Sequence, residues 1–314
     1  MNPIFSVIMP VYNAATTVDR ALDSVKKQTF NPMEVIVVDD CSTDESVNIV
    51  EEWKRKNSHV PVVLLKNSIN KGPAGARNEG IRYAKGNWIA FIDADDEWLP
   101  DKLEVQKLFI EQNPDVVMVC GKTSKSEVNG DRKFSFREIK LEEFALANPI
   151  ATSTVVVKTE VIKRIGGFDE SFRGPEDYEL WMRIAAKHRI LSIERQIAIY
   201  GEGRDRISFN DVTFLPQVKR VIEKAYRKGG VLYSLQNTQG EGKKITRFAR
   251  RKAMAWQYLS ASWAAAERGA IGRAMGLFLR SLCWWPLSFR PERVLPLGRM
   301  KIIIFIARRV CKKN

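Results

Sequence analysis

Apolar residues in the first hundred positions follow two alternating patterns. Runs such as Phe5–Pro10 and Glu34–Asp40 are rich in valine and isoleucine, which is typical of strands covered on both faces. Between them, Thr17–Gln28 carries apolar residues at the three- and four-residue spacing of one helical face. The alternation predicts βαβ units and a mostly parallel sheet with helices on both faces. Further strands are predicted at Val60–Leu65, Asn87–Ile92, Val116–Cys120 and Ser153–Val157, and further helices at Ala74–Ala84, Lys102–Glu111 and Glu176–Lys187.

Local signals predict where some of these elements begin. Ser42 and Glu45 fit the S-x-x-E capping box, which predicts that the second helix starts directly after Ser42. The pair Gly72-Pro73 predicts a break before the third helix. The polar stretch Ser124–Arg137 is expected to be a loop.

The positive charge of the chain is concentrated near its C-terminus. The 314 residues are 45% hydrophobic and 28% charged, which excludes a wholly disordered or collagen-like protein. The formal net charge is +14, yet residues 1–220 hold 31 basic and 33 acidic side chains, whereas residues 221–314 hold 20 and 4. We therefore expect a near-neutral domain at 1–220 and a basic, aromatic-rich region at 221–314.

The sequence does not show the patterns of a zinc site, a disulfide scaffold, a secretory signal or a membrane-spanning segment. The four cysteines are far apart and the chain has two histidines, so neither a zinc site nor a disulfide scaffold is indicated. The N-terminus has no basic segment followed by a sustained apolar one, and the apolar run at Ile302–Ala307 is far shorter than the about 20 residues that span a bilayer. The protein is therefore expected to be cytoplasmic.

Two predicted strands end in carboxylates. Asp39 and Asp40 end the second strand, and the sequence DADD at 93–96 follows the fourth. Ligands of open α/β sheets bind at the carboxyl ends of the strands, so these groups are expected to converge. Three carboxylates within four residues repel one another and favour a hard divalent cation that shares its ligands with a phosphate. The alternative is an acidic turn that caps the next helix.

Four segments in order give the sequence a family resemblance: FSVIMPVYN, EVIVVDDCSTD, KGPAGARNEGIRYAKGNWIAFIDADD and GGFDESFRGPEDYELWMRIA. Over residues 1 to about 200, the chain resembles the family 2 glycosyltransferases. The resemblance implies the GT-A fold, an α/β doubly wound mixed sheet with helices on both faces. Here it would carry an added, mainly helical and basic C-terminal extension. It also implies inverting transfer of a sugar from a nucleotide-sugar donor.

The resemblance assigns a donor site to residues from three segments. Asp40 would accept a hydrogen bond from the base, and Arg77 would offset phosphate charge. The divalent metal, Mn²⁺ or Mg²⁺, would be held by Asp95 directly, with Asp93 facing the ribose or a metal-bound water and Asp96 in the same site. The nucleotide-sugar site implied in this way consists of Pro10, Val11, Tyr12, Asp40, Arg77, Asn78, Asp93 and Ala94.

The acceptor side of the reaction is assigned to Glu176 and Asp177. Asp177 resembles the family's catalytic base, and Glu176 would orient the site or bind the acceptor. The alternative reading is that both carboxylates stabilise a helix N-terminus, and the two readings are compatible. Gly166 and Gly167 are expected to form a turn beside the sugar, and Trp181 is expected in the core.

The C-terminal region interleaves basic and aromatic side chains. Helices are predicted at about 244–268 and 270–283, followed by an interfacial piece at Lys301–Lys313. Three roles stay open: contact with an anionic membrane surface, nucleic-acid binding, and a helical subdomain that packs its aromatic residues. The family resemblance favours the membrane, because such enzymes often extend glycans on polyprenyl-diphosphate carriers. No nucleic-acid partner is expected.

The function expected from this sequence is transfer of a sugar from a UDP-sugar to a hydroxyl of a glycan or lipid-linked oligosaccharide, in surface polysaccharide biosynthesis. The expected location is the inner face of the cell membrane, as a peripheral protein. One alternative is a sugar nucleotidyltransferase, which should carry a glycine-rich basic loop after the first strand, where this chain has VYNAATT. The other is a non-catalytic glycan- or membrane-binding protein on the same scaffold.

Overall fold

The computed structural model describes residues 4–31, 33–124, 135–201, 210–233 and 249–285. The described chain forms two compact units, residues 1–140 with 150–203, and residues 141–149 with 204–314. The strands are β1 (Phe5–Val11), β2 (Met33–Asp39), β3 (Val62–Lys66), β4 (Trp88–Phe91), β5 (Glu97–Trp98), β6 (Val116–Ser124), β7 (Phe136–Ile139), β8 (Val156–Lys158) and β9 (Arg189–Ile199). The helices are α1 (Val18–Lys26), α2 (Ser46–Lys56), α3 (Gly72–Tyr83), α4 (Lys102–Gln112), α5 (Thr159–Ile165), α6 (Glu176–Ala185), α7 (Asp211–Tyr226), α8 (Ala249–Glu267) and α9 (Ile271–Trp284), with short 3-10 turns η1 (Leu141–Ala145) and η2 (Thr152–Thr154).

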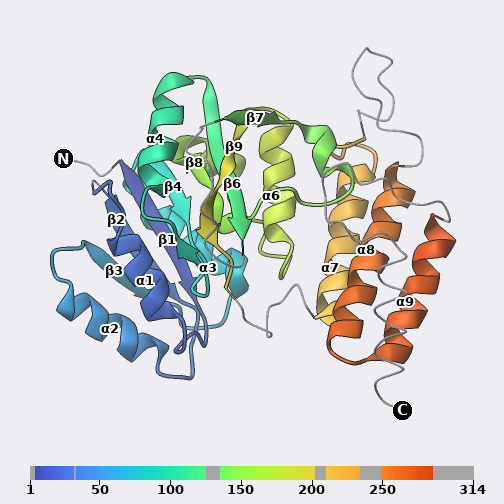
Figure 1. Cartoon of the computed structure of the whole chain (residues 1–314), viewed down its shortest axis with the longest axis horizontal. Helices are drawn as coiled ribbons and strands as arrows, with labels where there is room; N and C mark the ends of the chain where they lie inside the picture. The colour runs from blue at the N-terminus through green and yellow to red at the C-terminus, as the bar shows by residue number, and fades with distance from the viewer. Residues whose placement is uncertain (1–3, 32, 125–134, 202–209, 234–248, 286–314) are drawn as a thin grey trace. The chain divides into compact units, whose positions relative to one another are not determined.

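The first unit is built on one mixed sheet (Figure 1). Its strand order is β3-β2-β1-β4-β8-β6-β9-β5, with β7 paired to β9. The β3-β2-β1-β4 half is parallel, and β8 joins it antiparallel to both β4 and β6. The prediction of a mixed α/β sheet is confirmed.

Helices cover both faces of this sheet. Val7 and Met9 of β1 belong to one buried cluster with apolar residues of α1, α2 and α4. On the opposite face, Ile8 is so close to α3 that a Cβ at Gly80 would lie 2.6 Å from its side chain. Phe91, paired with Ile8 across β1 and β4, packs against Trp181 of α6. Because the β1 and β4 ends lie between these layers, residues just beyond them line one edge of the sheet.

Some local predictions are wrong. Helix α2 begins at Ser46 without a side-chain cap, and the hydroxyl of Ser42 instead accepts a hydrogen bond from the Asn13 N–H at 3.0 Å. Ser153, expected in a strand, lies in the turn η2, and β8 starts at Val156. Helix α3 begins at Gly72 with a proline in its first turn, because proline fits that position. The expected loop at Ser124–Arg137 lies largely outside the described residues.

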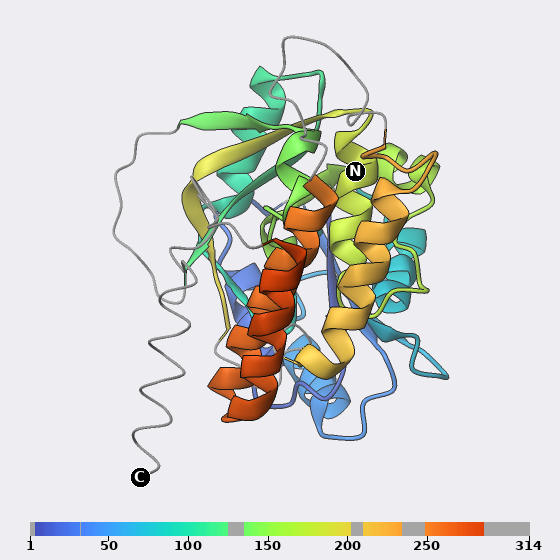
Figure 2. The same cartoon turned by 90° about the vertical axis from the view of Figure 1, so that its right-hand side faces the viewer.

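The second unit is mainly helical. Figure 2 shows α7, α8 and α9 running side by side, and the Ser262 hydroxyl of α8 donates to the Ala274 carbonyl of α9 at 2.7 Å. The predicted helices near 244–268 and 270–283 correspond to α8 and α9, whereas the piece at Lys301–Lys313 lies outside the described residues. Among the described helices, none combines the length and apolar character needed to cross a membrane. The domain division at residue 220 stays a prediction, and α7 runs through that position.

Candidate active site

The loop after β4 brings three carboxylates together. Oxygens of Asp93, Asp95 and Asp96 lie within 4.8 Å of one another. Asp96 is buried, and its oxygens accept from the Ser153 hydroxyl at 2.6 Å and from the Gly201 N–H at 2.9 Å. Burial, followed by the charges of Asp93 and Asp95, raises the pKa of Asp96 to about 6. The cluster therefore presents the carboxylates of the partly exposed Asp93 and Asp95, whereas Asp96 is buried and bound by Ser153 and Gly201.

This donor set fits a hard divalent cation. Mg²⁺ and Mn²⁺ prefer carboxylate oxygens and often take only one or two from the protein, with substrate phosphates completing the shell. Asp93 and Asp95 are partly exposed, whereas both oxygens of Asp96 already accept hydrogen bonds from the protein. The geometry thus suits Asp93 and Asp95 as ligands better than Asp96.

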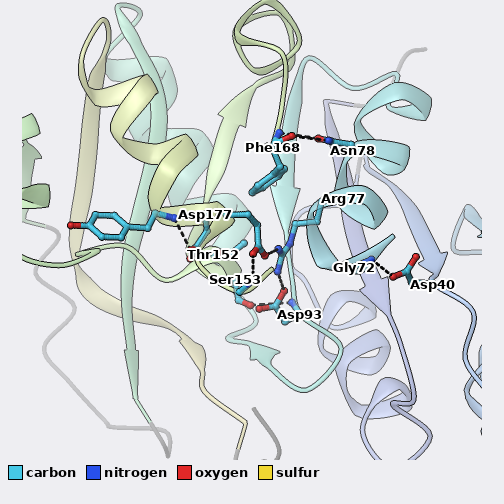
Figure 3. Close-up of polar contacts among 12 residues, drawn as sticks. Asp40, Gly72, Arg77, Asn78, Asp93, Thr152, Ser153, Phe168 and Asp177 are labelled. Carbon is cyan, nitrogen blue, oxygen red and sulfur yellow. Dashed lines mark hydrogen bonds and ion pairs between the residues drawn. The ribbon is translucent and has the colours of Figure 1, made fainter. Parts of the chain in front are cut away.

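Arg77 connects the acidic cluster to helix α6 (Figure 3). Its guanidinium is buried, with Nη2 lying 2.7 Å from Asp93 Oδ1 and Nη1 lying 2.6 Å from Glu176 Oε1. Burial by itself lowers the pKa of Arg77, but the charges of Asp93 and Glu176 outweigh it and raise the pKa. Arg77 therefore stays charged and holds together a loop and a helix that are far apart in the sequence.

Asp177 lies in the first turn of α6, next to Glu176. It is partly exposed, and its Oδ2 accepts a hydrogen bond from Thr152 Oγ1 at 3.0 Å. Desolvation raises the pKa of Asp177 to about 7, and the charge of Glu176 adds to this effect, while Arg77 and the Thr152 hydrogen bond oppose it. A carboxylate with such a pKa can accept a proton near neutral pH.

The turn η2 contacts both groups of carboxylates. Thr152 binds Asp177, and the adjacent Ser153 donates to Asp96 while accepting a hydrogen bond from the Asp93 N–H at 3.0 Å. The Ser153 carbonyl in turn accepts from Trp98 Nε1 at 2.7 Å. Sequence reasoning missed Thr152 and Ser153, because isolated hydroxyl residues near a strand carry no signal of a distant partner.

Asp40 and Asn78, both assigned to the donor site from the sequence, hold loops in place. The buried Asp40 carboxylate accepts from Asn67 Nδ2 at 2.8 Å and from the N–H groups of Lys71 and Gly72 at 2.9 and 2.7 Å. In Figure 3 the Asp40–Gly72 pair lies apart from the Arg77 ion pairs. Asp40 therefore fixes the start of α3, and its role in base binding stays a prediction.

Asn78 fixes the loop that precedes α6. Its amide donates to the Phe168 carbonyl and accepts from the Phe168 N–H, both at 2.9 Å. A Cβ on Gly167, whose φ is +67°, would lie 2.5 Å from Asn78 Oδ1, so glycine is required there. Asn78 thus supports the site through this loop.

The remaining predicted donor residues lie at strand ends. Pro10 and Val11 end β1 and Val11 is buried, whereas the Tyr12 side chain is 54% exposed and available to a ligand. Ala94 is buried within the acidic loop. Trp181 is fully buried, which confirms its expected place in the core.

The chain matches a protein-family model and is similar to known proteins in sequence and in structure. The family model described as "Glycosyl transferase family 2" matches residues 6–163. An uncharacterized glycosyltransferase of Haemophilus influenzae is 34% identical over 187 residues, which cover 58% of this chain and 62% of that protein. The chain thus spans less than two thirds of that relative.

Two further similar proteins are a glucosyltransferase and a mannosyltransferase. The Escherichia coli protein WfgD, a UDP-Glc:alpha-D-GlcNAc-diphosphoundecaprenol beta-1,3-glucosyltransferase, is 32% identical over 192 residues, 60% of this chain and 73% of WfgD. The structure of mannosyltransferase PcManGT from Pyrobaculum calidifontis, in complex with GDP-Man and Mn²⁺, superposes with a TM-score of 0.63 at 21% identity, covering 100% of this chain and 89% of that one. At this low sequence identity, the similarity to PcManGT is evidence for a shared fold alone.

Proposed function

Because the chain belongs to glycosyl transferase family 2, we propose that it is an inverting enzyme that moves a sugar from a UDP-sugar to a hydroxyl group. The acceptor is a glycan or a lipid-linked oligosaccharide of a surface polysaccharide pathway. Family membership shows that the reaction class is glycosyl transfer. The UDP donor, the acceptor class and inversion at the anomeric carbon are what we propose in addition.

One observation carries the assignment of roles: Arg77 pairs with Asp93 on one side and Glu176 on the other. This contact ties the acidic cluster, suited to a cation and a diphosphate, to the helix that carries Asp177. A displacement at an anomeric carbon needs a stabilised leaving group and a base for the incoming hydroxyl. The two ion pairs of Arg77 therefore connect the residues proposed to stabilise the leaving group with the helix that carries the proposed base.

In the proposed reaction, Asp177 accepts the proton of the acceptor hydroxyl as its oxygen forms the bond to the anomeric carbon. The bond from that carbon to the UDP oxygen breaks, and UDP leaves with the bonding electrons. Thr152 orients the Asp177 carboxylate through its hydrogen bond. Asp93 and Asp95 would hold Mn²⁺ or Mg²⁺, which when bound neutralises charge on the diphosphate.

The UDP donor and the lipid-linked acceptor are supported by the similarity to WfgD, a UDP-Glc:alpha-D-GlcNAc-diphosphoundecaprenol beta-1,3-glucosyltransferase. The divalent metal is supported by the acidic cluster and by the Mn²⁺ complex of PcManGT. A lipid-linked acceptor would place the protein at a membrane surface as a peripheral protein. The basic region at 221–314 agrees with that placement.

A thermal-shift screen of nucleotide sugars with Mn²⁺ tests the proposed donor class. We expect one UDP-sugar to raise the melting temperature more than GDP- or ADP-sugars do, because a ligand that binds only the folded state stabilises it. Slow hydrolysis of that donor, read as UDP release, should follow. A non-catalytic scaffold would be stabilised without releasing UDP, and stabilisation by GDP-mannose alone would overturn the UDP assignment.

A further inference from the structure

The second unit contains a cavity of about 320 Å³ between helices α7 and α9. Tyr258 of α8 forms part of its lining, as do Leu215 of α7 and Leu277 of α9. All three helices belong to the same compact unit, and Figure 2 shows them side by side. The volume is at the lower end of the range for ligand sites in proteins.

Cations outnumber carboxylates around this cavity. Its one acidic lining residue is Asp211, whose buried side chain pairs with both Arg268 and Arg273. Lys219 and Arg280 add two further positive charges to the lining, and within the described part of the chain no carboxylate pairs with either of them. The cavity therefore has a net positive lining that is suited to a phosphate group.

The two helices that line most of the cavity also expose apolar side chains. On α9, Met275 and Leu279 are 42% and 55% exposed and lie one turn apart, and Val212 of α7 is 53% exposed. Val212 itself lines the cavity, whereas Met275 and Leu279 lie on a different face of α9 from the lining residues Gly276, Leu277 and Arg280. A cationic pocket with an exposed apolar side chain in its lining, on helices that expose further apolar side chains, matches an anionic head joined to hydrocarbon chains.

We propose that the cavity between α7 and α9 binds the phosphate head of an anionic membrane phospholipid. Lys219 and Arg280 contact the phosphate, and Val212 contacts the start of an acyl chain. This site gives the membrane contact of the basic region a defined location. It does not depend on the proposed sugar transfer, because the site lies wholly in the second unit.

Vesicle flotation with the full-length protein tests the charge requirement. Phosphatidylcholine vesicles with and without phosphatidylglycerol are compared, for the wild type and for the double variant Lys219→Glu with Arg280→Glu. We expect the variant to bind the anionic vesicles at least about tenfold more weakly, because the two cations that contact the phosphate are replaced by carboxylates that repel it. The matched control, Arg250→Glu with Arg251→Glu on the exposed surface of α8, should weaken binding less. Equal weakening by both would show diffuse attraction and overturn the pocket.

Two helical glycines test the cavity itself without a change in charge. A Cβ on Gly272 or on Gly276 meets no atom within 4 Å, but only Gly276 lines the cavity. Gly276→Leu should fill the cavity and weaken anionic-vesicle binding about tenfold, whereas Gly272→Leu adds the same apolar group and should leave binding unchanged. Unchanged binding by Gly276→Leu would contradict the proposal.

Inorganic phosphate distinguishes a lipid from a free anion. Chloride of equal ionic strength is the reference. We expect millimolar inorganic phosphate to displace no more protein from anionic vesicles than this chloride does. Selective displacement would instead assign the cavity to free phosphate. These measurements need no donor sugar and can be repeated in Asp177→Asn, so their failure is distinct from a failure of the proposed catalysis.

Discussion

The guanidinium of Arg77 lies 2.6 Å from the carboxylate of Glu176, a residue 99 positions later in the chain. Arg77 is on α3 and Glu176 opens α6, so the contact holds together two helices that pack on the same face of the sheet. Through its second nitrogen, Arg77 also binds Asp93. One side chain thereby sets the position of the groups proposed to bind the donor and to activate the acceptor.

Arg77→Lys should destabilise the protein and lower its activity. A lysine ammonium cannot reproduce the planar fork that reaches two carboxylates, so either the buried Glu176 or the partly exposed Asp93 would lose its partner. Breaking a buried ion pair costs about 3 kcal/mol or more, which urea unfolding measures. The exposed pair between Arg20 and Glu97 offers a control, since Arg20→Lys should change the free energy of unfolding by less than about 1 kcal/mol. Equal effects of the two substitutions would contradict a structural role for Arg77.

The Thr152 hydroxyl should control the protonation of Asp177. Thr152→Val removes a hydrogen bond that lowers the pKa of Asp177, so this pKa should rise and the acid limb of the kcat–pH profile should move to higher pH. Thr152→Ser keeps the hydroxyl and should restore the wild-type profile. A loss of activity in Thr152→Val without a shifted profile would indicate a packing defect.

Activity of the wild type should fall as the pH drops through about 7. Asp177 has a pKa raised to about 7, and only its ionised form can accept a proton from the acceptor. The charge of Glu176 contributes to the raised value, so Glu176→Gln should move the acid limb to lower pH. A wild-type profile that is flat from pH 5 to pH 8 would contradict the assignment of Asp177 as base.

Asp95 should dominate metal affinity. Asp95→Asn removes one of the two partly exposed carboxylates of the cluster and should weaken Mn²⁺ binding by about tenfold or more in calorimetric titration with UDP present. Asp115→Asn is a matched control, because Asp115 is an exposed carboxylate paired with Arg189 outside the cluster. Removal of metal with EDTA should abolish transfer, and full activity in metal-free buffer would contradict the metal site.

Much of the fold was predictable because it depends on local patterns. The period of the apolar residues predicted most strands and helices of residues 1–120, and the carboxylates at the end of the fourth predicted strand indicated the acidic cluster. The capping box at Ser42 was misleading, because the Ser42 hydroxyl binds the backbone of Asn13, a tertiary partner. Strand β9 and helix α7 were not predicted.

The contacts within the site were harder to predict. The family resemblance assigned Arg77 and Asn78 to the donor site, but the partners of Arg77 are Asp93 and Glu176, and Asn78 binds the backbone of Phe168. Each of these contacts joins segments brought together only by folding. Thr152 and Ser153 were missed for the same reason, since a hydroxyl gives no sign in the sequence of the carboxylate that it will bind.

The most direct test of the account is the Asp177→Asn variant assayed for UDP release in the presence of donor, acceptor and Mn²⁺. Asparagine cannot accept the proton, so turnover should fall by about 10²- to 10⁴-fold. Donor binding, measured by thermal shift, should stay close to that of the wild type, because the acidic cluster and the end of β1 are unchanged. Wild-type turnover in Asp177→Asn would contradict the proposed mechanism.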